Sequence, residues 1–235
     1  LLPRGCRLLS ERRHQRKLQV GTHRSNRFEV TLRNPSINNQ AIAERLDLIG
    51  RRGVPNYFGP QRFGRAFRNV EKARQMFEGK RIRCHWRRSL YLSSVRALLF
   101  NRVLHTRVRE GTWNKALIGD LMSLDGTRSF FQATCVDAST SARVLLFDIH
   151  PTGPLCGVNE HQPVFEAGLV ESRALKNMDW WMDGLRAENI EGKRRALRLK
   201  VQQLSASYES DLVKVRFELE KGGYATSVIR ELFYV

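Results

Sequence analysis

The chain has 235 residues, 41% of them hydrophobic, and at this length it can bury roughly 70 to 75% of its unfolded surface in one large or two smaller domains. Its formal net charge is +18, from 32 arginines and 9 lysines against 23 acidic residues. No apolar run approaches the ~20 residues that cross a bilayer, and the first residues lack the apolar stretch of a secretory signal. Composition therefore argues against a membrane or secreted protein and favours a cytoplasmic one.

Alternation and helical spacing predict a strand and then helices in the first half of the chain. Residues 17–33 end in alternating apolar and polar side chains, which is typical of a half-buried strand. Asn34-Pro35 breaks the pattern, and Ser36 is a candidate N-cap for a helix that continues to Gly53. Helical spacing predicts two further helices, at 66–77 and 92–103.

The second half is more mixed. Between Gly111 and Gly157 we expect short strands, including the apolar runs Phe130-Phe131 and Val144 to Ile149. Helical spacing returns in two places, at 164–170 and through Ile190, Arg194, Leu197 and Val201. Residues 213–220 alternate as a clear strand that Gly222-Gly223 ends, and a last helix is predicted to begin close to Tyr224.

The run GVPNYFGPQRFG, Gly53 to Gly64, shows neither the alternation of a strand nor the spacing of an amphipathic helix. Its glycines permit positive φ or close backbone approach, Pro55 fixes φ, and its aromatic and arginine side chains supply stacking faces and planar donors. Such a run is either a surface built around a ligand or an interdomain loop with two aromatics anchored in the core.

This run resembles the signature of the TruD family of tRNA pseudouridine synthases. Further stretches resemble that family's motifs in the same order: KLQVGTHRSNRFEVTLR (17–33), LSSVRALLFN (92–101) and GGYATSVIREL (222–232). Weaker similarity lies at the Gly119-Asp120 turn and in a helix expected around Glu191 to Leu199.

The resemblance implies an α+β fold in two domains. A mixed, mainly antiparallel sheet of the pseudouridine-synthase type would be formed by both chain ends, residues 1–52 and 200–235. Residues 53–199 would form a mostly helical α/β insertion domain.

One family motif is missing. The family's catalytic aspartate lies in a Gly-x-Lys-Asp motif upstream of the 17–33 stretch, and this sequence contains no Gly-x-Lys-Asp. None of its eight aspartates matches that motif: Asp47, Asp120, Asp125, Asp137, Asp148, Asp179, Asp183 and Asp211. We expect either a C-terminal portion of a longer enzyme, with the nucleophile in a segment outside this sequence, or a catalytically inactive RNA-binding remnant.

The implied reaction detaches uracil from C1′ of the ribose, turns it and reattaches it through C5, without redox cofactor, nucleotide cofactor or metal. Flipping the base costs about a few kcal/mol, and stacking on an aromatic side chain returns roughly 1 to 3 kcal/mol per base. By resemblance, Asn26 and Tyr224 match substrate-contacting positions, and Phe28 matches the aromatic that follows the asparagine. Family members often carry phenylalanine at the Tyr224 position.

Ordinary structural roles compete for these three residues. Phe28 is in phase with the apolar face of its strand, Asn26 is also a plausible turn residue, and Tyr224 could pack behind the Gly-Gly turn. Arg62 and Arg230 are further candidates, because an arginine can hold a nucleophilic carboxylate ionised or contact the target phosphate. Lys17 is a similar candidate, and a solvated surface cation is the alternative for all three.

The charge and the positions of the cysteines indicate which kinds of partner and ligand to expect. An arginine-rich charge spread over the whole chain favours a nucleic acid over a membrane surface, and the family implies tRNA. Cys6, Cys84, Cys135 and Cys156 lie far apart without a Cys-x-x-Cys pair, so we expect reduced thiols and no metal site. A basic structural protein such as a ribosomal subunit is a third possibility, against which the glycine and aromatic motifs argue.

Overall fold

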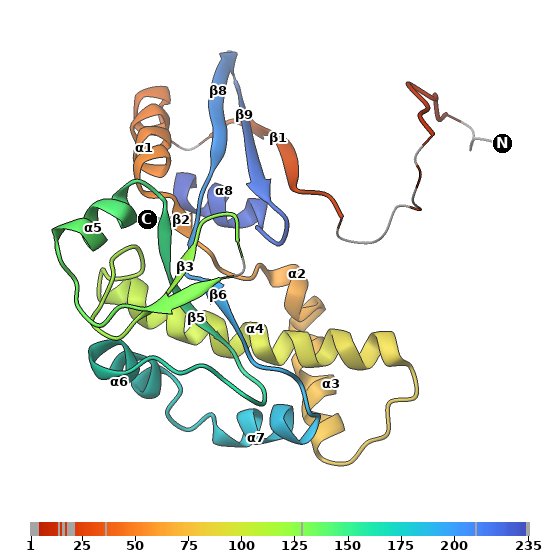
Figure 1. The fold of residues 1–235 in the computed structure, drawn as a ribbon. Coiled ribbons are helices and arrows are strands. Elements are labelled where there is room, and N and C mark those ends of the chain that lie inside the picture. Colours follow the sequence, from red (N-terminus) through yellow and green to blue (C-terminus); the bar gives the residue numbers. More distant parts are fainter. Residues whose placement is uncertain are drawn as a thin grey trace.

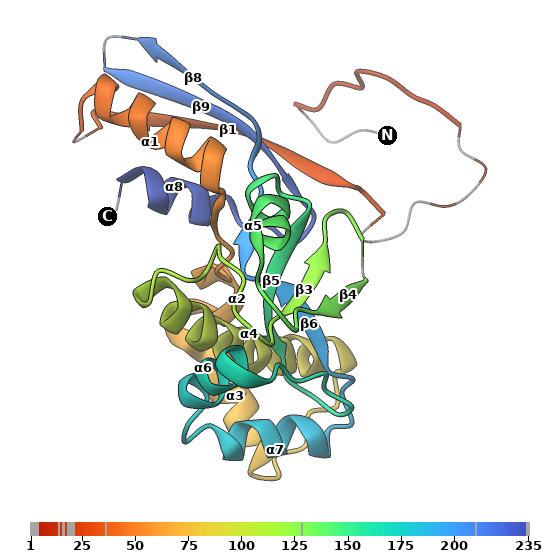
Figure 2. The ribbon, with the colours of Figure 1, turned by 60° about the vertical axis from the view of Figure 1, so that its left-hand side comes forward.

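The computed structural model describes residues 5–13, 15, 17, 22–35, 37–127, 129–209 and 211–233. Both ends of the sequence contribute to one group of elements, the upper part of Figure 1. This group consists of β1 (Ser25–Arg33), α1 (Asn39–Arg52), β8 (Gln202–Glu209), β9 (Leu212–Glu220) and α8 (Ala225–Phe233). The strands form an antiparallel sheet of order β1-β9-β8, and α1 and α8 cover one of its faces (Figure 2).

The middle of the sequence forms the lower part of Figure 1. Its helices are α2 (Pro60–Phe63), the 3-10 turn η1 (Arg65–Phe67), α3 (Arg68–Phe77), α4 (His85–Arg109), α5 (Ala138–Leu145), α6 (Phe165–Ala174) and α7 (Asp179–Ala187). Its antiparallel sheet has the order β4-β3-β5-β6, with β3 (Leu121–Leu124), β4 (Phe130–Gln132), β5 (Ile149–Leu155) and β6 (Lys193–Ala196). The short pair β2 (Val54–Pro55) and β7 (Arg198–Leu199) connects the two groups. The predicted α+β class with antiparallel sheets is confirmed.

Periodicity explains the upper core. Phe28 lies opposite Phe217 and Val30 opposite Val215, so the apolar residues of β1 and β9 share one face. That face packs on apolar residues of α1 and α8, which recur at helical spacing. The opposite face carries charged residues, including the ion pair between Arg216 and Glu29 at 2.6 Å. The strand predicted at 17–33 is observed from Ser25.

The helix predicted from residue 37 is α1, and its N-cap is Asn38, whose side-chain oxygen accepts from the Ala41 amide at 2.8 Å. The candidate cap Ser36 lies outside the described residues.

The helix predicted at Ile190 to Val201, including the one expected around Glu191 to Leu199, is wrong. This range contains β6 and β7, because β6 pairs with β5 from Thr152↔Ala196 to Leu155↔Lys193. A few apolar residues at three- and four-residue spacing match a helix by chance, and strand pairing overrode them.

The strand predicted at Val144 to Ile149 is also wrong over most of its length. Val144 and Leu145 end α5, Leu146 to Asp148 form a turn, and β5 begins at Ile149. Asp137 caps α5 by accepting from the Thr140 amide at 2.7 Å. The helix α7 was not predicted.

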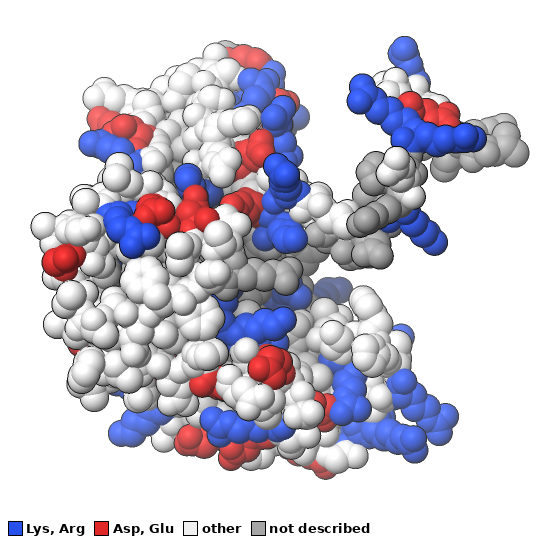
Figure 3. Space-filling model, in the orientation of Figure 1, with Lys and Arg blue, Asp and Glu red and all other residues white. Residues whose placement is uncertain are grey.

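Lysine and arginine side chains gather on the side of the upper group that faces the N-terminal residues and again on the lower group (Figure 3). Within the described part of the chain, no helix combines the length and apolar character needed to cross a membrane.

Candidate active site

The Gly53 to Gly64 run lies where the two groups of elements meet. At Gly53 the chain turns out of α1 with φ +71°, and an added Cβ would lie 2.6 Å from the Leu199 carbonyl oxygen, so only glycine fits. The buried Asn56 donates its side-chain N–H to the Ala196 carbonyl at 2.8 Å. The Asn101 side chain, from α4, accepts from the Phe58 amide at 2.9 Å and donates to the Phe58 carbonyl at 3.0 Å. Hydrogen bonds to β6 and to α4 thus hold the run in place.

Tyr224 and Arg62, 162 residues apart, meet in this region. The Arg62 Nε donates to the Tyr224 hydroxyl at 2.9 Å, and its Nη1 donates to Ser93 Oγ at 3.3 Å. The Phe58 ring packs edge-on against the Tyr224 ring, with centroids 5.8 Å apart, and the Arg62 guanidinium carbon lies 5.6 Å from the Phe58 centroid. The structure therefore builds an aromatic and cationic cluster from the two motifs.

Arg195 of β6 joins this cluster. Its guanidinium carbon lies 4.2 Å from the Phe58 centroid, and its Nη2 donates to Asn56 Oδ1 at 2.6 Å and to the Gly222 carbonyl at 2.9 Å. Burial lowers the pKa of Arg195 to about 10. Sequence reasoning missed Arg195, because it stands in a run of three cations that carries no signal of which one is buried.

Arg230 occupies a neighbouring site. Its guanidinium carbon lies 5.0 Å from the Tyr57 ring centroid, and burial raises the pKa of Tyr57 against the opposing charge of Arg230. Both residues line an apolar cavity of about 720 Å³ between the start of α8, Val30 of β1 and residues 57–60. Arg230 therefore contacts Tyr57, whereas Arg62 contacts Tyr224 and Phe58.

The remaining candidates lie further along β1 and before it. Asn26 is exposed and opposite Leu219, near the end of β9 that leads into Tyr224, and its side chain contacts the His23 ring at 3.4 Å. Phe28 is half-buried and stacks on Phe217 with centroids 5.4 Å apart. Lys17 is exposed. Asn26 and Tyr224 lie at the same end of the sheet, while Phe28 contacts the core.

Gly59 lets Tyr224 approach the run, because an added Cβ would lie 2.7 Å from Thr226 Oγ1 and 3.0 Å from the Tyr224 ring. We expect Gly59→Ala to lower the free energy of unfolding by about 1 to 3 kcal/mol, as overpacking does. Urea denaturation followed by circular dichroism measures it. Gly50→Ala is the matched control: its site in α1 has no neighbour within 4 Å, so it should stabilise by about 0.4 to 1 kcal/mol. A Gly59 variant as stable as the wild type would contradict this packing.

A polar cavity of about 240 Å³ adjoins the cluster, and its lining includes Arg195, Gly222, Gly223 and His150. The buried His150 accepts from Arg198 Nε at its Nδ1, over 3.2 Å, so its proton resides on Nε2, which lies 3.0 Å from Asp125 Oδ1. Lys200 also bonds Asp125, at 2.9 Å. Burial, aided by the charge of Arg198, holds the pKa of His150 below its ordinary value, although Asp125 opposes this.

This geometry predicts a pH dependence of stability. The neutral imidazole is favoured in the folded state, so its contribution is complete above the unfolded pKa of about 6.5 and is lost as pH falls toward the lower folded pKa. His150→Asn keeps an acceptor for Arg198 but does not titrate. The difference in unfolding free energy between wild type and His150→Asn, measured from pH 8 to pH 5, should therefore shrink below about pH 6.5. A constant difference would contradict a neutral buried His150.

The cysteines take no part in these contacts. Cys6, Cys84 and Cys135 are exposed and Cys156 is buried, with burial raising its pKa to about 12. Across the described ranges, no three His, Cys, Asp or Glu side chains are grouped to hold a metal ion.

Comparison with known proteins decides the family. The family model described as tRNA pseudouridine synthase D (TruD) matches residues 3–79 and 85–232. The chain belongs to the TruD family. The tRNA pseudouridine synthase D of Nitrosococcus oceani is 41% identical over 223 residues, which are 94% of this chain and 62% of that protein. The corresponding protein of Hydrogenovibrio crunogenus is 42% identical over 234 residues, 98% of this chain and 67% of that protein.

The chain thus spans about two thirds or slightly less of the length of these TruD relatives. A solved TruD structure from Methanosarcina mazei superposes with a TM-score of 0.68 at 19% identity, covering 95% of this chain and 72% of that one. At this identity the match supports the fold. The family resemblance inferred from the motifs is confirmed.

Proposed function

We propose that this chain forms most of a tRNA pseudouridine synthase that isomerises a uridine in tRNA. The observation that carries the proposal is the contact between Arg62 of the glycine-rich run and Tyr224 of the C-terminal motif, beside Phe58. The contact brings together two TruD-like motifs, residues 53–64 and 222–232, that lie far apart in the sequence.

In the proposed reaction the uridine leaves its stack and packs on Tyr224, while Asn26, exposed at the same end of the sheet, reads its polar edge. The C1′–N1 bond breaks, the base turns, and a C1′–C5 bond forms; C5 loses a proton and N1 gains one, so no oxidant or cofactor is consumed. We further propose that the nucleophilic aspartate comes from a segment that this sequence does not include. Phe28 and Lys17 remain candidate contacts, Phe28 through its half-buried edge.

The same proposal covers the organisation of the chain. Residues 1–52 and 200–235 would form the catalytic domain, with residues 53–199 as the insertion domain. The apolar cavity beside Tyr57 and Arg230 would then lie next to the substrate. The high positive charge suits a tRNA partner, and the enzyme would work in the cytoplasm.

Incubation of this chain, and separately of the full-length gene product, with unmodified tRNA tests the proposal. Digestion and mass spectrometry of the nucleosides, with a label on C5 to follow its proton, report pseudouridine. We expect turnover by the longer product and binding without turnover by this chain. Binding without turnover by both would favour an inactive RNA-binding module.

A further inference from the structure

Arg62 and Arg195 both lie against the Phe58 ring, and neither has an acidic partner among the residues that the structure describes. Their guanidinium carbons are 5.6 and 4.2 Å from the ring centroid. None of the ion pairs formed among the described residues includes either arginine. Arg107 and Arg194 differ, because each binds a carboxylate at 2.9 Å.

The neighbours of the two groups are neutral. Arg62 donates to the hydroxyls of Tyr224 and Ser93, and Arg195 donates to Asn56 and to the Gly222 carbonyl through Nη2 alone. The Nε of Arg195 is buried and has no acceptor among the described residues. The charge of Arg62 adds to the burial that lowers the Arg195 pKa. Two like charges in a partly desolvated site favour the arrival of an anion.

The space beside Arg195 can admit one. Arg195 lines the 240 Å³ cavity, and its Nη1 lies next to Gly222, where an added Cβ would be 3.5 Å away. The cavity is also lined by Arg198 and Lys200. Of its two acidic residues, Asp125 is bound by Lys200 and His150, and the other is Glu220. The wall at Gly222 and Gly223 leads directly into Tyr224.

We propose that Arg195, with Arg62 beside it, binds a backbone phosphate of the RNA next to the base that Tyr224 holds. This proposal rests on the proposed function for the identity of the ligand. Arginine suits the role, because its planar donors match phosphate oxygens and its face stacks on Phe58. Fixing the phosphate would set the sugar of the flipped nucleotide relative to the Tyr224 ring.

Arginine Nε–H signals in the NMR spectrum of the ¹⁵N-labelled protein test the site without turnover. They are assigned with Arg195→Lys and Arg62→Lys. The protein is titrated at constant ionic strength with inorganic phosphate, uridine 5′-monophosphate, uridine and acetate. We expect saturable shifts of the Arg195 and Arg62 signals with phosphate and the monophosphate only. An absent response, or an equal response to acetate, would overturn a phosphate site.

Variants connect the site to RNA. Arg195→Gln should weaken monophosphate binding by about tenfold or more and reduce the slope of log affinity for tRNA against log salt by about one. If Arg195→Gln fails to fold, the same two measurements are made on Arg62→Gln, which should also weaken monophosphate binding and reduce the salt slope. Arg186→Gln, which alters an exposed pair with Asp183, is the matched control. Phosphate binding with an unchanged tRNA salt slope would refute an RNA phosphate as the ligand, and this result is independent of whether uridine is isomerised.

Discussion

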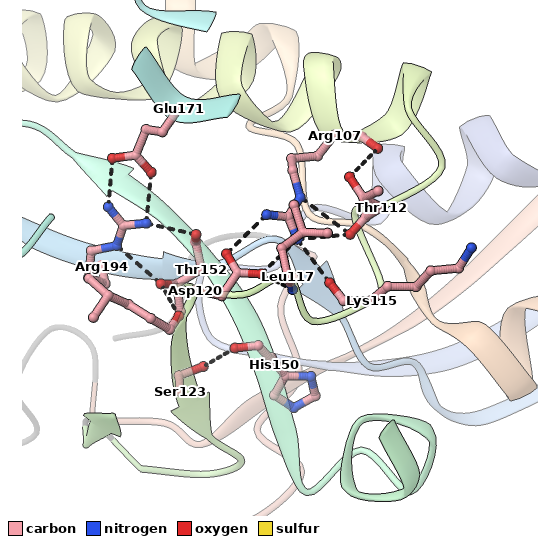
Figure 4. A network of polar contacts seen from close by, with 11 residues as sticks. Arg107, Thr112, Lys115, Leu117, Asp120, Ser123, His150, Thr152, Glu171 and Arg194 are labelled. Atoms are coloured by element: carbon pink, nitrogen blue, oxygen red, sulfur yellow. Dashed lines mark hydrogen bonds and ion pairs between the residues drawn. The ribbon is translucent and has the colours of Figure 1, made fainter. Parts of the chain in front are cut away.

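Replacing Arg107 with methionine should lower the free energy of unfolding by about 3 to 5 kcal/mol, the cost of breaking a buried ion pair. The Arg107 and Asp120 side chains are 3% and 2% exposed, and two parallel hydrogen bonds of 3.0 and 2.9 Å join them (Figure 4). Arg107 also donates to the carbonyls of Thr112 and Lys115, each at 2.9 Å. The variant leaves the buried Asp120 carboxylate without its cation, with the Leu117 amide at 2.7 Å as a remaining donor, and removes the Arg107 hydrogen bonds to the two carbonyls. Urea denaturation measures the loss.

The matched control is Arg186→Met, in a pair whose side chains are 44% and 69% exposed, where roughly 0 to 1 kcal/mol is expected. A double variant, Arg107→Met with Asp120→Leu, should be less destabilised than the sum of the single variants, because no charge is then left buried alone. An Arg107 variant that loses no more than the Arg186 control would contradict the importance of this pair. Arg107 lies in the last turn of the long helix α4 and Asp120 directly precedes β3, so the pair joins helix to sheet.

Tyr224→Ala in the complete enzyme should slow pseudouridine formation by about ten- to a hundredfold, if the ring stacks on the flipped base. The variant also removes the hydroxyl that accepts from Arg62 and the ring that packs on Phe58. Affinity for tRNA should change little, because many arginines share the phosphate contacts. Single-turnover rates and filter binding measure the two quantities separately, and Asn26→Ala should show the same separation.

Tyr224→Phe is the control for this prediction. It keeps the stacking face and loses only the hydroxyl, so most of the rate should remain. Equal losses of rate and affinity in Tyr224→Ala, or a Tyr224→Phe variant as slow as the alanine variant, would count against stacking as the role of this side chain.

Prediction from sequence worked best where one face of an element is buried along its whole length. Val213, Val215, Phe217 and Leu219 alternate in the sequence and are all buried in β9, and Val228 and Leu232 are buried at helical spacing in α8. It failed at β6, where all three residues of the Lys193-Arg194-Arg195 run are cations. There Arg194 binds Glu171 and Arg195 stacks on Phe58, so these long side chains are placed by distant partners rather than by solvent.

The residues of the candidate site also fall into those predicted from the sequence and those found only in the structure. Motif resemblance pointed to Asn26, Phe28 and Tyr224, and the chemistry of arginine added Arg62 as a candidate. The structure joins Arg62 to Tyr224 directly. Motif resemblance gave no indication that Arg195 would lie on Phe58 or that His150 would be held between Arg198 and Asp125. Single cations and histidines carry no periodic signal, and their neighbours come from segments tens of residues away.

The sequence by itself determined the family, the high positive charge and the elements with a regular apolar face, because composition, periodicity and motif order can be read directly from the chain. Only the tertiary structure decided which arginines are buried without an acid, which strands pair with β5, and that the glycine-rich run meets the C-terminal motif. Those outcomes depend on contacts between residues that are far apart in the sequence and become buried together only in the folded chain. No single stretch of the sequence shows these contacts.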